Sequence, residues 1–255
     1  MSREIAKVNN ISLSYSEEDK ELVVMDKVNL SVYYNEFLSI IGPSGCGKSS
    51  LIRMIIGLQK PTGGDVTFKG KVVDGPPDAV SLVFQNVALI PWKTALDNVA
   101  FALENRGIPR AAIEKKSAAA LKLVELDGFE TAFPSELSGG MKQRVGIARA
   151  LVSDPDLLLM DEPFSALDEL TADQLRVEVR TVLKNKHLPL KSVVLVSHNV
   201  EEVTEMSDRI VVLSKPPSHI VDIIKVDLPY PRNKRSKEFE KVTDRIFKDL
   251  YAAKA

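Results

Sequence analysis

The stretch Gly-Pro-Ser-Gly-Cys-Gly-Lys-Ser-Ser contains the residues whose types and spacing point most directly to chemistry. It fits the phosphate-binding pattern G-x-x-x-x-G-K-[ST]. A glycine-rich loop lets successive backbone N–H groups point at phosphate oxygens, and a helix that begins there adds the positive end of its dipole. We therefore predict a nucleotide-binding loop, whose members are Gly42, Pro43, Ser44, Gly45, Cys46, Gly47, Lys48, Ser49 and Ser50.

Two side chains of this loop are expected to act directly on the nucleotide. Lys48 would reach the β- and γ-phosphates, and the Ser49 hydroxyl would bind Mg²⁺. The alternative is a glycine-rich turn with a surface lysine. Residues 37–41 read as a short buried strand and residues 50–58 as an apolar-rich helix. The order of strand, loop and helix favours phosphate binding.

A second candidate anion site lies at the start of a predicted helix over residues 139–153. Ser138 supplies an N-cap hydroxyl, while Gly139 and Gly140 leave backbone N–H groups uncovered. A simple capped helix start explains Ser138. It does not explain two glycines followed by the polar residues 142–144, so we predict that this helix start also binds phosphate.

Two carboxylates follow an uninterrupted apolar run, Leu157–Met160, which reads as a buried parallel strand. Side chains alternate along a strand, so Asp161 and Glu162 are expected to point in different directions and to serve different purposes. Asp161 would lie beside Ser49 and its Mg²⁺. Glu162 would face the γ-phosphate and polarise water as a general base. The alternative is a strand that ends in a solvated acidic turn.

Three further side chains stand at strand ends. Gln85 follows a short apolar run at the edge where ligand sites lie in α/β folds, and it could reach a metal or an attacking water. His198 follows the apolar run 191–196 and is expected to contact the γ-phosphate. Tyr15 closes the run 5–15 and could stack on adenine. The alternatives are a solvated glutamine, a structural histidine and a tyrosine packed on neighbouring strands.

The elements that would position these residues indicate an α/β fold. The expected architecture is a P-loop core with a mostly parallel sheet, an N-terminal antiparallel β subdomain and an inserted α-helical subdomain at about 94–153. Predicted antiparallel strands lie at 5–15, 27–34 and 65–73, predicted core strands at 37–41, 81–85, 157–161, 191–196 and 210–213, and an edge hairpin at 219–228. Further helices are predicted at 109–126, from 169 to about 187 and at 236–251. We expect one domain over 1–228 and a C-terminal tail over 229–255.

Composition limits the partners. The chain has 34 Lys and Arg against 35 Asp and Glu, so no overall basic field argues for nucleic acid. Its single cysteine, Cys46, excludes an internal disulfide and suits a reducing cytoplasm. Neither a secretion signal nor a membrane-spanning apolar run is recognised, so a soluble chain is expected. Trp92, the only tryptophan, is either a core residue or a docking residue.

Taken in order, these motifs resemble the ATP-binding subunit of an ABC transporter over about residues 5–228. The most specific match is Leu-Ser-Gly-Gly-Met-Lys-Gln-Arg at 137–144, and Ser-Ala-Leu-Asp at 165–168 adds to it. The resemblance implies ATP hydrolysis and a head-to-tail homodimer. Each ATP would be held by one chain's loop 42–50 and the other chain's residues 138–140, with Asp168 communicating across the interface. It also implies a separate transmembrane permease and a peripheral position on the cytoplasmic face of the inner membrane.

A narrower resemblance is to importers of nitrate, sulfonates and taurine. It rests on the segments 89–99, 107–110 and 227–232, and the chain departs from the pattern at Asn199 and at 216–220. This resemblance implies a small anionic solute that a solute-binding protein delivers to the permease. The alternatives are a soluble ABC ATPase that acts on ribosomes or DNA, and a regulatory module for which ATP is only a signal.

Overall fold

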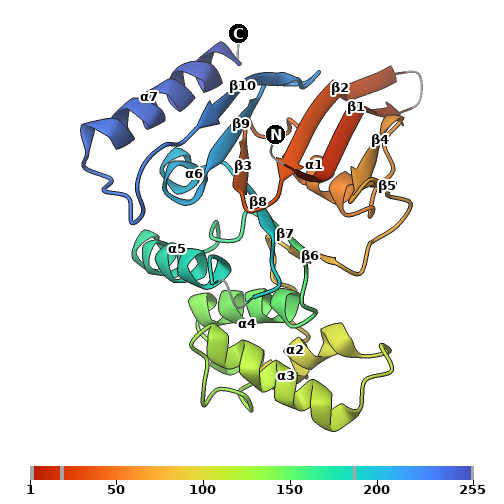
Figure 1. Ribbon diagram of the computed structural model, residues 1–255, viewed down its shortest axis with the longest axis vertical. Helices are drawn as coiled ribbons and strands as arrows, with labels where there is room; N and C mark the ends of the chain where they lie inside the picture. The colour runs from red at the N-terminus through yellow and green to blue at the C-terminus, as the bar shows by residue number, and fades with distance from the viewer. Residues whose placement is uncertain (1–2, 18–19, 186–187, 254–255) are drawn as a thin grey trace. The chain divides into compact units, whose positions relative to one another are not determined.

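The computed structural model describes residues 3–17, 20–185 and 188–253. The contacts between residues form two compact units (Figure 1). The first unit contains the chain up to Pro77 and again from Lys191 onward, and the second runs from Asp78 to Leu190.

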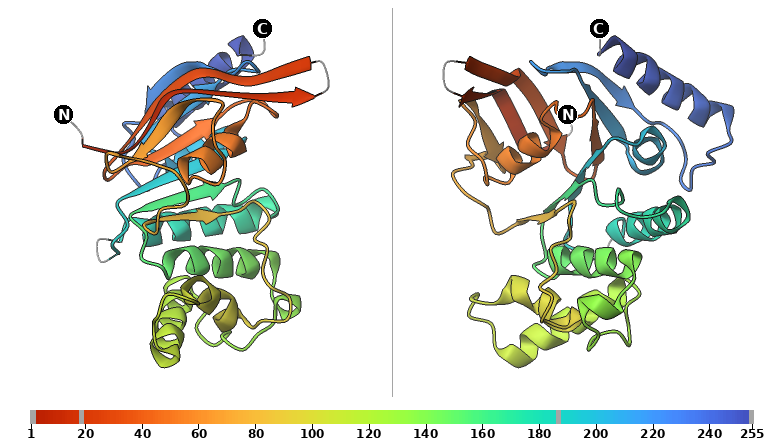
Figure 2. Two further views of the ribbon diagram at one scale, coloured as in Figure 1. Left: turned by 90° about the vertical axis from the view of Figure 1, so that its right-hand side faces the viewer. Right: turned by 180° about the vertical axis from the view of Figure 1, so that it is seen from behind.

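An antiparallel sheet in the first unit has the strand order β2-β1-β4-β5. Its strands are β1 (Glu4–Glu17), β2 (Lys20–Tyr33), β4 (Gly63–Phe68) and β5 (Lys71–Val72). β1 and β2 run side by side along their length (Figures 1 and 2). This confirms the predicted N-terminal antiparallel part of the fold.

The strands of this sheet differ from the prediction at two places. A charged turn is predicted at 16–21, but Ser16 pairs with Glu21, so both strands extend into this stretch; residues 18–19 lie outside the described residues. Polar side chains that project into solvent do not interrupt the pairing of the backbones. The predicted strand 65–73 is divided into β4 and β5, because Lys69 and Gly70 both take positive φ angles at a tight turn.

The second sheet of the first unit has the order β10-β9-β3-β8. Its strands are β3 (Phe37–Ile41), β8 (Ser192–Ser197), β9 (Arg209–Leu213) and β10 (Ile220–Lys225). β3 runs parallel to β8 and β9, whereas β10 is an antiparallel edge strand. The carboxyl ends of β3 and β8 therefore lie at the same sheet edge, where Ile41 pairs with Ser197. The residues that follow these two strands are brought close together.

Three helices accompany these strands: α1 (Lys48–Ile55), α6 (Val200–Met206) and α7 (Lys237–Ala252). α7 corresponds to the predicted terminal helix. Ser236 caps its N-terminus, because the Ser236 hydroxyl accepts a hydrogen bond from the Phe239 N–H. Ile246 of α7 is fully buried in an apolar cluster that it shares with Ile41, Val203 and Ile210. The C-terminal helix therefore belongs to the core of this unit.

The second unit is mostly helical. Two parallel strands, β6 (Val80–Val83) and β7 (Leu157–Asp161), pair with each other. The helices are α2 (Ala95–Ala100), α3 (Arg110–Leu123), α4 (Gly139–Leu151) and α5 (Glu169–Leu183), with short 3₁₀ turns at Phe101–Leu103 and Pro134–Glu136. α5 stops earlier than predicted, and residues 186–187 of the predicted helix lie outside the described residues. The predicted inserted α-helical subdomain is confirmed as part of the fold, and its helices α2, α3 and α4 lie between Ala95 and Leu151.

Of the helices in the described ranges, none has the length and hydropathy that a bilayer-spanning segment requires.

Candidate functional site

The glycine-rich loop joins the end of β3 to the start of α1 in the first unit. Gly45 and Gly47 have φ angles of +78° and +90°, a region that disfavours residues with a Cβ atom. A Cβ atom on Gly47 would also lie 2.6 Å from the terminal methyl of Met25. The backbone conformation therefore favours glycine at both positions, and at Gly47 the side chains of β2 also leave little space for a Cβ atom.

The start of α1 is arranged to accept an anion. Among the described side chains none caps the helix at Gly47, and its first turn contains no acidic residue. Lys48 is almost fully buried, and its Nζ donates to the carbonyls of Gly42 at 2.9 Å and Pro43 at 3.0 Å. An ammonium group is thus held inside the loop, next to the positive end of the helix dipole.

His198 lies beside the first half of this loop, as its position after β8 predicts. A cleft of about 470 Å³ has walls formed by Gly42, Pro43, Ser44, His198, Val200, Phe247, Leu250 and Tyr251. The side chain of His198 is exposed. The next residue, Asn199, departs from the family pattern, yet its side-chain oxygen caps α6 by accepting from the Glu202 N–H at 3.1 Å. The importer pattern usually has an aspartate at this position, and an asparagine amide can make the same capping bond as an aspartate carboxylate.

Tyr15 lies near the end of β1 with 45% of its surface exposed. Its hydroxyl accepts a hydrogen bond from Gln59 Nε2 at 2.9 Å. A large part of this side chain is therefore exposed near the end of the strand.

In the second unit, Gln85 and Glu162 meet beyond the ends of the parallel strands β6 and β7. Gln85 Nε2 donates to Glu162 Oε2 at 3.2 Å and lies 3.5 Å from the Ser165 hydroxyl. Glu162 has a φ of +47°, which is uncommon for a residue other than glycine and is concentrated at functional sites. Asp161 is buried as the last residue of β7. The two adjacent carboxylates thus occupy different environments.

The start of α4 forms a separate group with the segment that precedes α5. Ser138 caps α4 by accepting from the Met141 N–H at 3.2 Å. A Cβ atom on Gly140 would lie 3.0 Å from the Thr171 side chain, so a larger residue would displace this neighbour. Asp168 caps α5 by accepting from the Thr171 N–H at 3.0 Å. The hydrogen bonds from the backbone and the side chain of Thr171 hold the pKa of the Asp168 carboxyl below its usual value.

Two polar residues near Ser138 do not belong to a phosphate site. Gln143 is buried, and Arg144 donates to the Val124 carbonyl at 2.9 Å and to the Glu178 carboxylate. The helical repeat turns these side chains toward the interior of the unit. The sequence argument that used both residues as evidence for an anion site is therefore wrong for them.

Sequence reasoning missed Arg149 of α4. Its guanidinium donates to the carbonyls of Val87 and Ala88, at 3.1 Å for the latter, and so holds the segment that follows Gln85 against α4. Burial lowers the pKa of this arginine. The available signal was a charged residue within an otherwise apolar part of α4.

The profile of the ABC transporter family matches residues 25–165, which is more than half of the chain. The chain belongs to the ABC transporter family. It is an ABC-type ATPase with the nucleotide-binding fold of this family, and the resemblance, the fold class and the ATPase activity predicted from the motifs are confirmed.

The similar proteins agree with this assignment. The chain is 45% identical to an uncharacterized ABC transporter ATP-binding protein of Methanocaldococcus jannaschii over 96% of this chain and 90% of that protein. It is 35% identical to the aliphatic sulfonates import ATP-binding protein SsuB of Bacillus cereus over 95% and 94%. A solved dimeric ATP-binding cassette in a post-hydrolysis state with ADP and Pi superimposes with a TM-score of 0.75 at 32% identity, over 87% of this chain and 98% of that one.

Proposed function

We propose that this chain is the ATP-hydrolysing subunit of an importer for a small anion such as a sulfonate, taurine or nitrate. The observation that carries the proposal is the contact between Gln85 and Glu162, because it joins a metal-binding or water-binding amide to a candidate general base. The similarity to sulfonate import ATP-binding proteins supports the choice of solute class.

In this proposal the loop 42–50 holds the phosphates and Tyr15 stacks on the adenine. Ser49, Gln85 and Asp161 would hold Mg²⁺ through a hydroxyl, an amide and a carboxylate oxygen, which are donors that suit this ion. Within the described ranges, no cluster of three or more His, Cys, Asp or Glu side chains forms a metal site by itself. The proposed set of one hydroxyl, one amide and one carboxylate therefore suits an ion that also binds phosphate oxygens. When bound, the ion would neutralise charge on the phosphates.

Hydrolysis would depend on four side chains. Glu162 accepts a proton from the attacking water, Lys48 and His198 contact the terminal phosphate, and Gln85 orients Glu162 through its amide. Lys48 Nζ donates to the carbonyls of Gly42 and Pro43, and these two residues line the same cleft as His198, which supports this division of roles.

Two copies of the chain would form the complete site. Ser138, Gly139 and Gly140 of one copy would bind the ATP held by the other copy's loop, and Asp168 would respond across the interface. Ser138 is exposed, and the two glycines that follow it lie close to Leu167 and Thr171, which supports this arrangement. The dimeric cassettes among the similar structures support it as well.

A transmembrane permease would dock on the second unit, on the cytoplasmic face of the membrane, and a solute-binding protein would act through that permease. Trp92 is 78% exposed, which favours docking over a core position. The backbone N–H groups of Ala95 and Leu96 donate to the carbonyls of Ala132 and Glu130, so the loop with the exposed Phe129 and Phe133 lies beside this segment. The resulting aromatic surface suits an apolar partner.

Glu162→Gln tests the proposed base. The variant should still bind ATP but lose turnover by about 10²–10⁴-fold, because the amide cannot accept the proton. Glu114→Gln, which changes an exposed carboxylate on α3, should retain wild-type turnover. Near-normal hydrolysis by Glu162→Gln would remove Glu162 from this role.

The same variant tests the dimer. Blocked hydrolysis should trap ATP between two copies, so size-exclusion chromatography in saturating Mg-ATP should show a dimer that ADP does not support. A strictly monomeric Glu162→Gln protein under these conditions contradicts the composite site.

Copurification tests the partner. An importer subunit should be recovered with an integral membrane protein, and reconstitution of that complex should give ATP-dependent uptake of labelled taurine, alkanesulfonate or nitrate. Recovery with ribosomes or DNA would support the soluble, non-transport ATPase instead.

A further inference from the structure

The turn between β9 and β10 reaches the phosphate-binding loop. Ser218 of this turn is fully buried, and its hydroxyl donates to the Cys46 carbonyl at 2.7 Å. A second acceptor, the Ser214 carbonyl, lies farther away at 3.2 Å. Because a hydroxyl has only one proton to donate, the shorter contact with the loop is the stronger one.

The backbone of Ser218 is bound to β2. Its N–H donates to the Val24 carbonyl at 2.8 Å, and its carbonyl accepts from the Asp26 N–H at 3.2 Å. The residue between these two, Met25, lies against Gly47 of the phosphate-binding loop. Ser218 and β2 therefore support adjacent residues of the loop and are hydrogen-bonded to each other.

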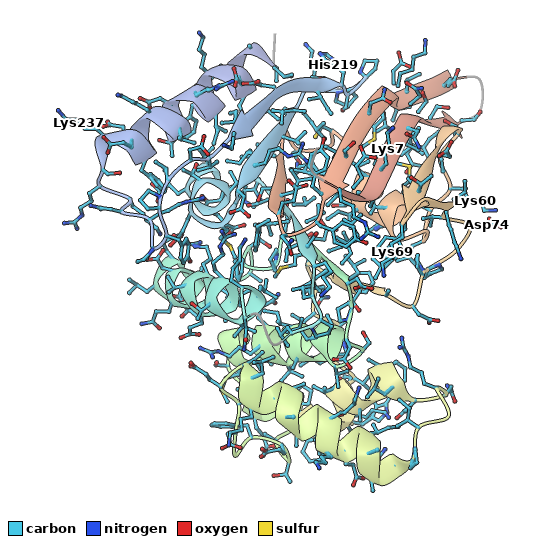
Figure 3. All side chains as sticks on the ribbon, in the orientation of Figure 1. Lys7, Lys60, Lys69, Asp74, His219 and Lys237 are labelled. Carbon is cyan, nitrogen blue, oxygen red and sulfur yellow. The ribbon has the colours of Figure 1, made fainter. Side chains whose placement is uncertain are left out.

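The turn itself is held by several bonds. The Ser214 N–H donates to the His219 carbonyl at 3.0 Å. The Ser214 hydroxyl lies 3.0 Å from Nδ1 of His219, which is labelled in Figure 3. The Lys215 N–H donates to the Ala253 carbonyl at 3.2 Å, which ties the turn to the chain just after α7. A turn fixed on both sides presents the Ser218 hydroxyl in one position.

We propose that Ser218 is a positioning residue for the phosphate-binding loop. In a planar trans peptide the C=O and the N–H point in opposite directions. By holding the Cys46 carbonyl toward the turn, Ser218 directs the Gly47 N–H away from the turn, into the loop that binds phosphate. The inference rests on the proposed role of the loop 42–50.

This orientation matters because Gly47 permits many conformations. Its φ of +90° is one of several that a glycine adopts readily, so the peptide between Cys46 and Gly47 needs an outside contact to keep one orientation. Without the Ser218 hydroxyl, the fraction of molecules with the binding-competent loop falls, and the apparent dissociation constant for a phosphate ligand rises by the same factor.

Ser218→Ala and Ser192→Ala provide a matched pair of variants. Ser192 is also buried, and its hydroxyl donates to the Tyr33 carbonyl at 2.6 Å. It begins β8 next to the start of β3, whereas the phosphate-binding loop follows the end of β3. Each variant removes one buried hydroxyl that bonds a backbone carbonyl, but only Ser218→Ala affects the loop.

The measurement is the ratio of the dissociation constants for adenosine and for Mg-ADP, obtained by calorimetry. Adenosine has no phosphates, so its affinity reports whether the rest of the nucleotide site is folded, independently of the phosphate contacts. The ratio should fall about tenfold in Ser218→Ala and stay within twofold of wild type in Ser192→Ala. Should Ser218→Ala fail to fold, Ser218→Cys, with its weaker thiol donor, is read by the same ratio.

An unchanged ratio in the Ser218 variant overturns the inference, as does an equal loss of both ligands. Lys48→Ala separates this result from the proposed function. A wild-type ratio that depends on Lys48 but not on Ser218 removes only the role of Ser218. A ratio that also ignores Lys48 removes the phosphate-binding role of the loop.

Discussion

At the scale of single residues, Cys46 shows how a variable position of a motif acquires a structural role. The sequence marks it only as a tolerated residue between the glycines. In the structure its side chain is fully buried, and a Cβ atom on Gly42 would lie 2.9 Å from its Sγ. Burial raises the pKa of the thiol, although nearby Lys48 partly opposes this effect.

The Cys46 thiol should therefore react very slowly in the native protein. Both the raised pKa and the lack of access keep the reactive thiolate away from reagents. Titration with a disulfide reagent at pH 8 should label less than about a tenth of the chains in the time that an exposed thiol reacts fully. Rapid labelling in guanidinium chloride serves as the control, since Cys46 is the only cysteine. Fast labelling of the folded protein would contradict the buried position.

The residues that sequence reasoning identified all belong to short motifs or follow strand ends. Gln85, Glu162 and His198 were predicted because a polar residue after an apolar run marks the edge of a parallel sheet. Ser218 and Arg149 were missed because their partners are distant in sequence, and a serine or an arginine has no local pattern that announces a bond to a remote carbonyl. Only the folded backbone brings these groups together.

At the scale of elements, α4 and the segment after Gln85 approach each other closely at Gly146. A Cβ atom on Gly146 would lie 2.4 Å from the Val87 side chain, and Arg149 holds the same segment one turn farther along the helix. The sequence predicts the helix correctly but offers no reason for a glycine inside it. The reason is the neighbouring segment.

Gly146→Ala should reveal this contact in a double-mutant cycle with Val87→Ala. Alanine is preferred over glycine inside a helix by about 1 kcal/mol, but overpacking against Val87 costs about 1–3 kcal/mol. Gly146→Ala should thus be less favourable in the wild-type background than in Val87→Ala, by at least about 1 kcal/mol of unfolding free energy. Urea denaturation of the four proteins measures this difference. Strict additivity would mean that the two residues do not touch.

At the scale of the whole molecule, the C-terminal helix has a place in the core that the sequence does not predict. The apolar residues of α7 recur at helical spacing, so one buried face is expected. The pattern cannot say which surface covers that face. In the structure Ile246 packs with residues of β3, α6 and β9, near the loop end of β3.

Ile246→Ala should accordingly lower the free energy of unfolding by about 2–5 kcal/mol, as for other large-to-small changes in a core. Lys241→Ala on the exposed face of α7 should change it by less than about 0.5 kcal/mol. Chemical denaturation compares the two. Equal stability of both variants would show that α7 is a peripheral tail.

The proposed head-to-tail dimer predicts that two variants, each inactive by itself, recover ATPase activity when they are mixed. Each of its two sites takes residues 42–50 from one copy and 138–140 from the other. Lys48→Ala spoils the loop in both sites of its homodimer, and Ser138→Arg, which places a cation at the positive end of α4, spoils the opposite half of both sites. A mixed dimer of these variants has both defects in one site and an intact loop facing an intact helix start in the other. Half of the dimers in an equal mixture are mixed, and each mixed dimer has one intact site of two, so ATPase activity should recover to at most about a quarter of wild type.

Pairing Lys48→Ala with the double variant Lys48→Ala and Ser138→Arg leaves every loop defective and is the control. If mixed dimers form but activity stays at the control level, each ATP is bound within one chain and the composite site is wrong.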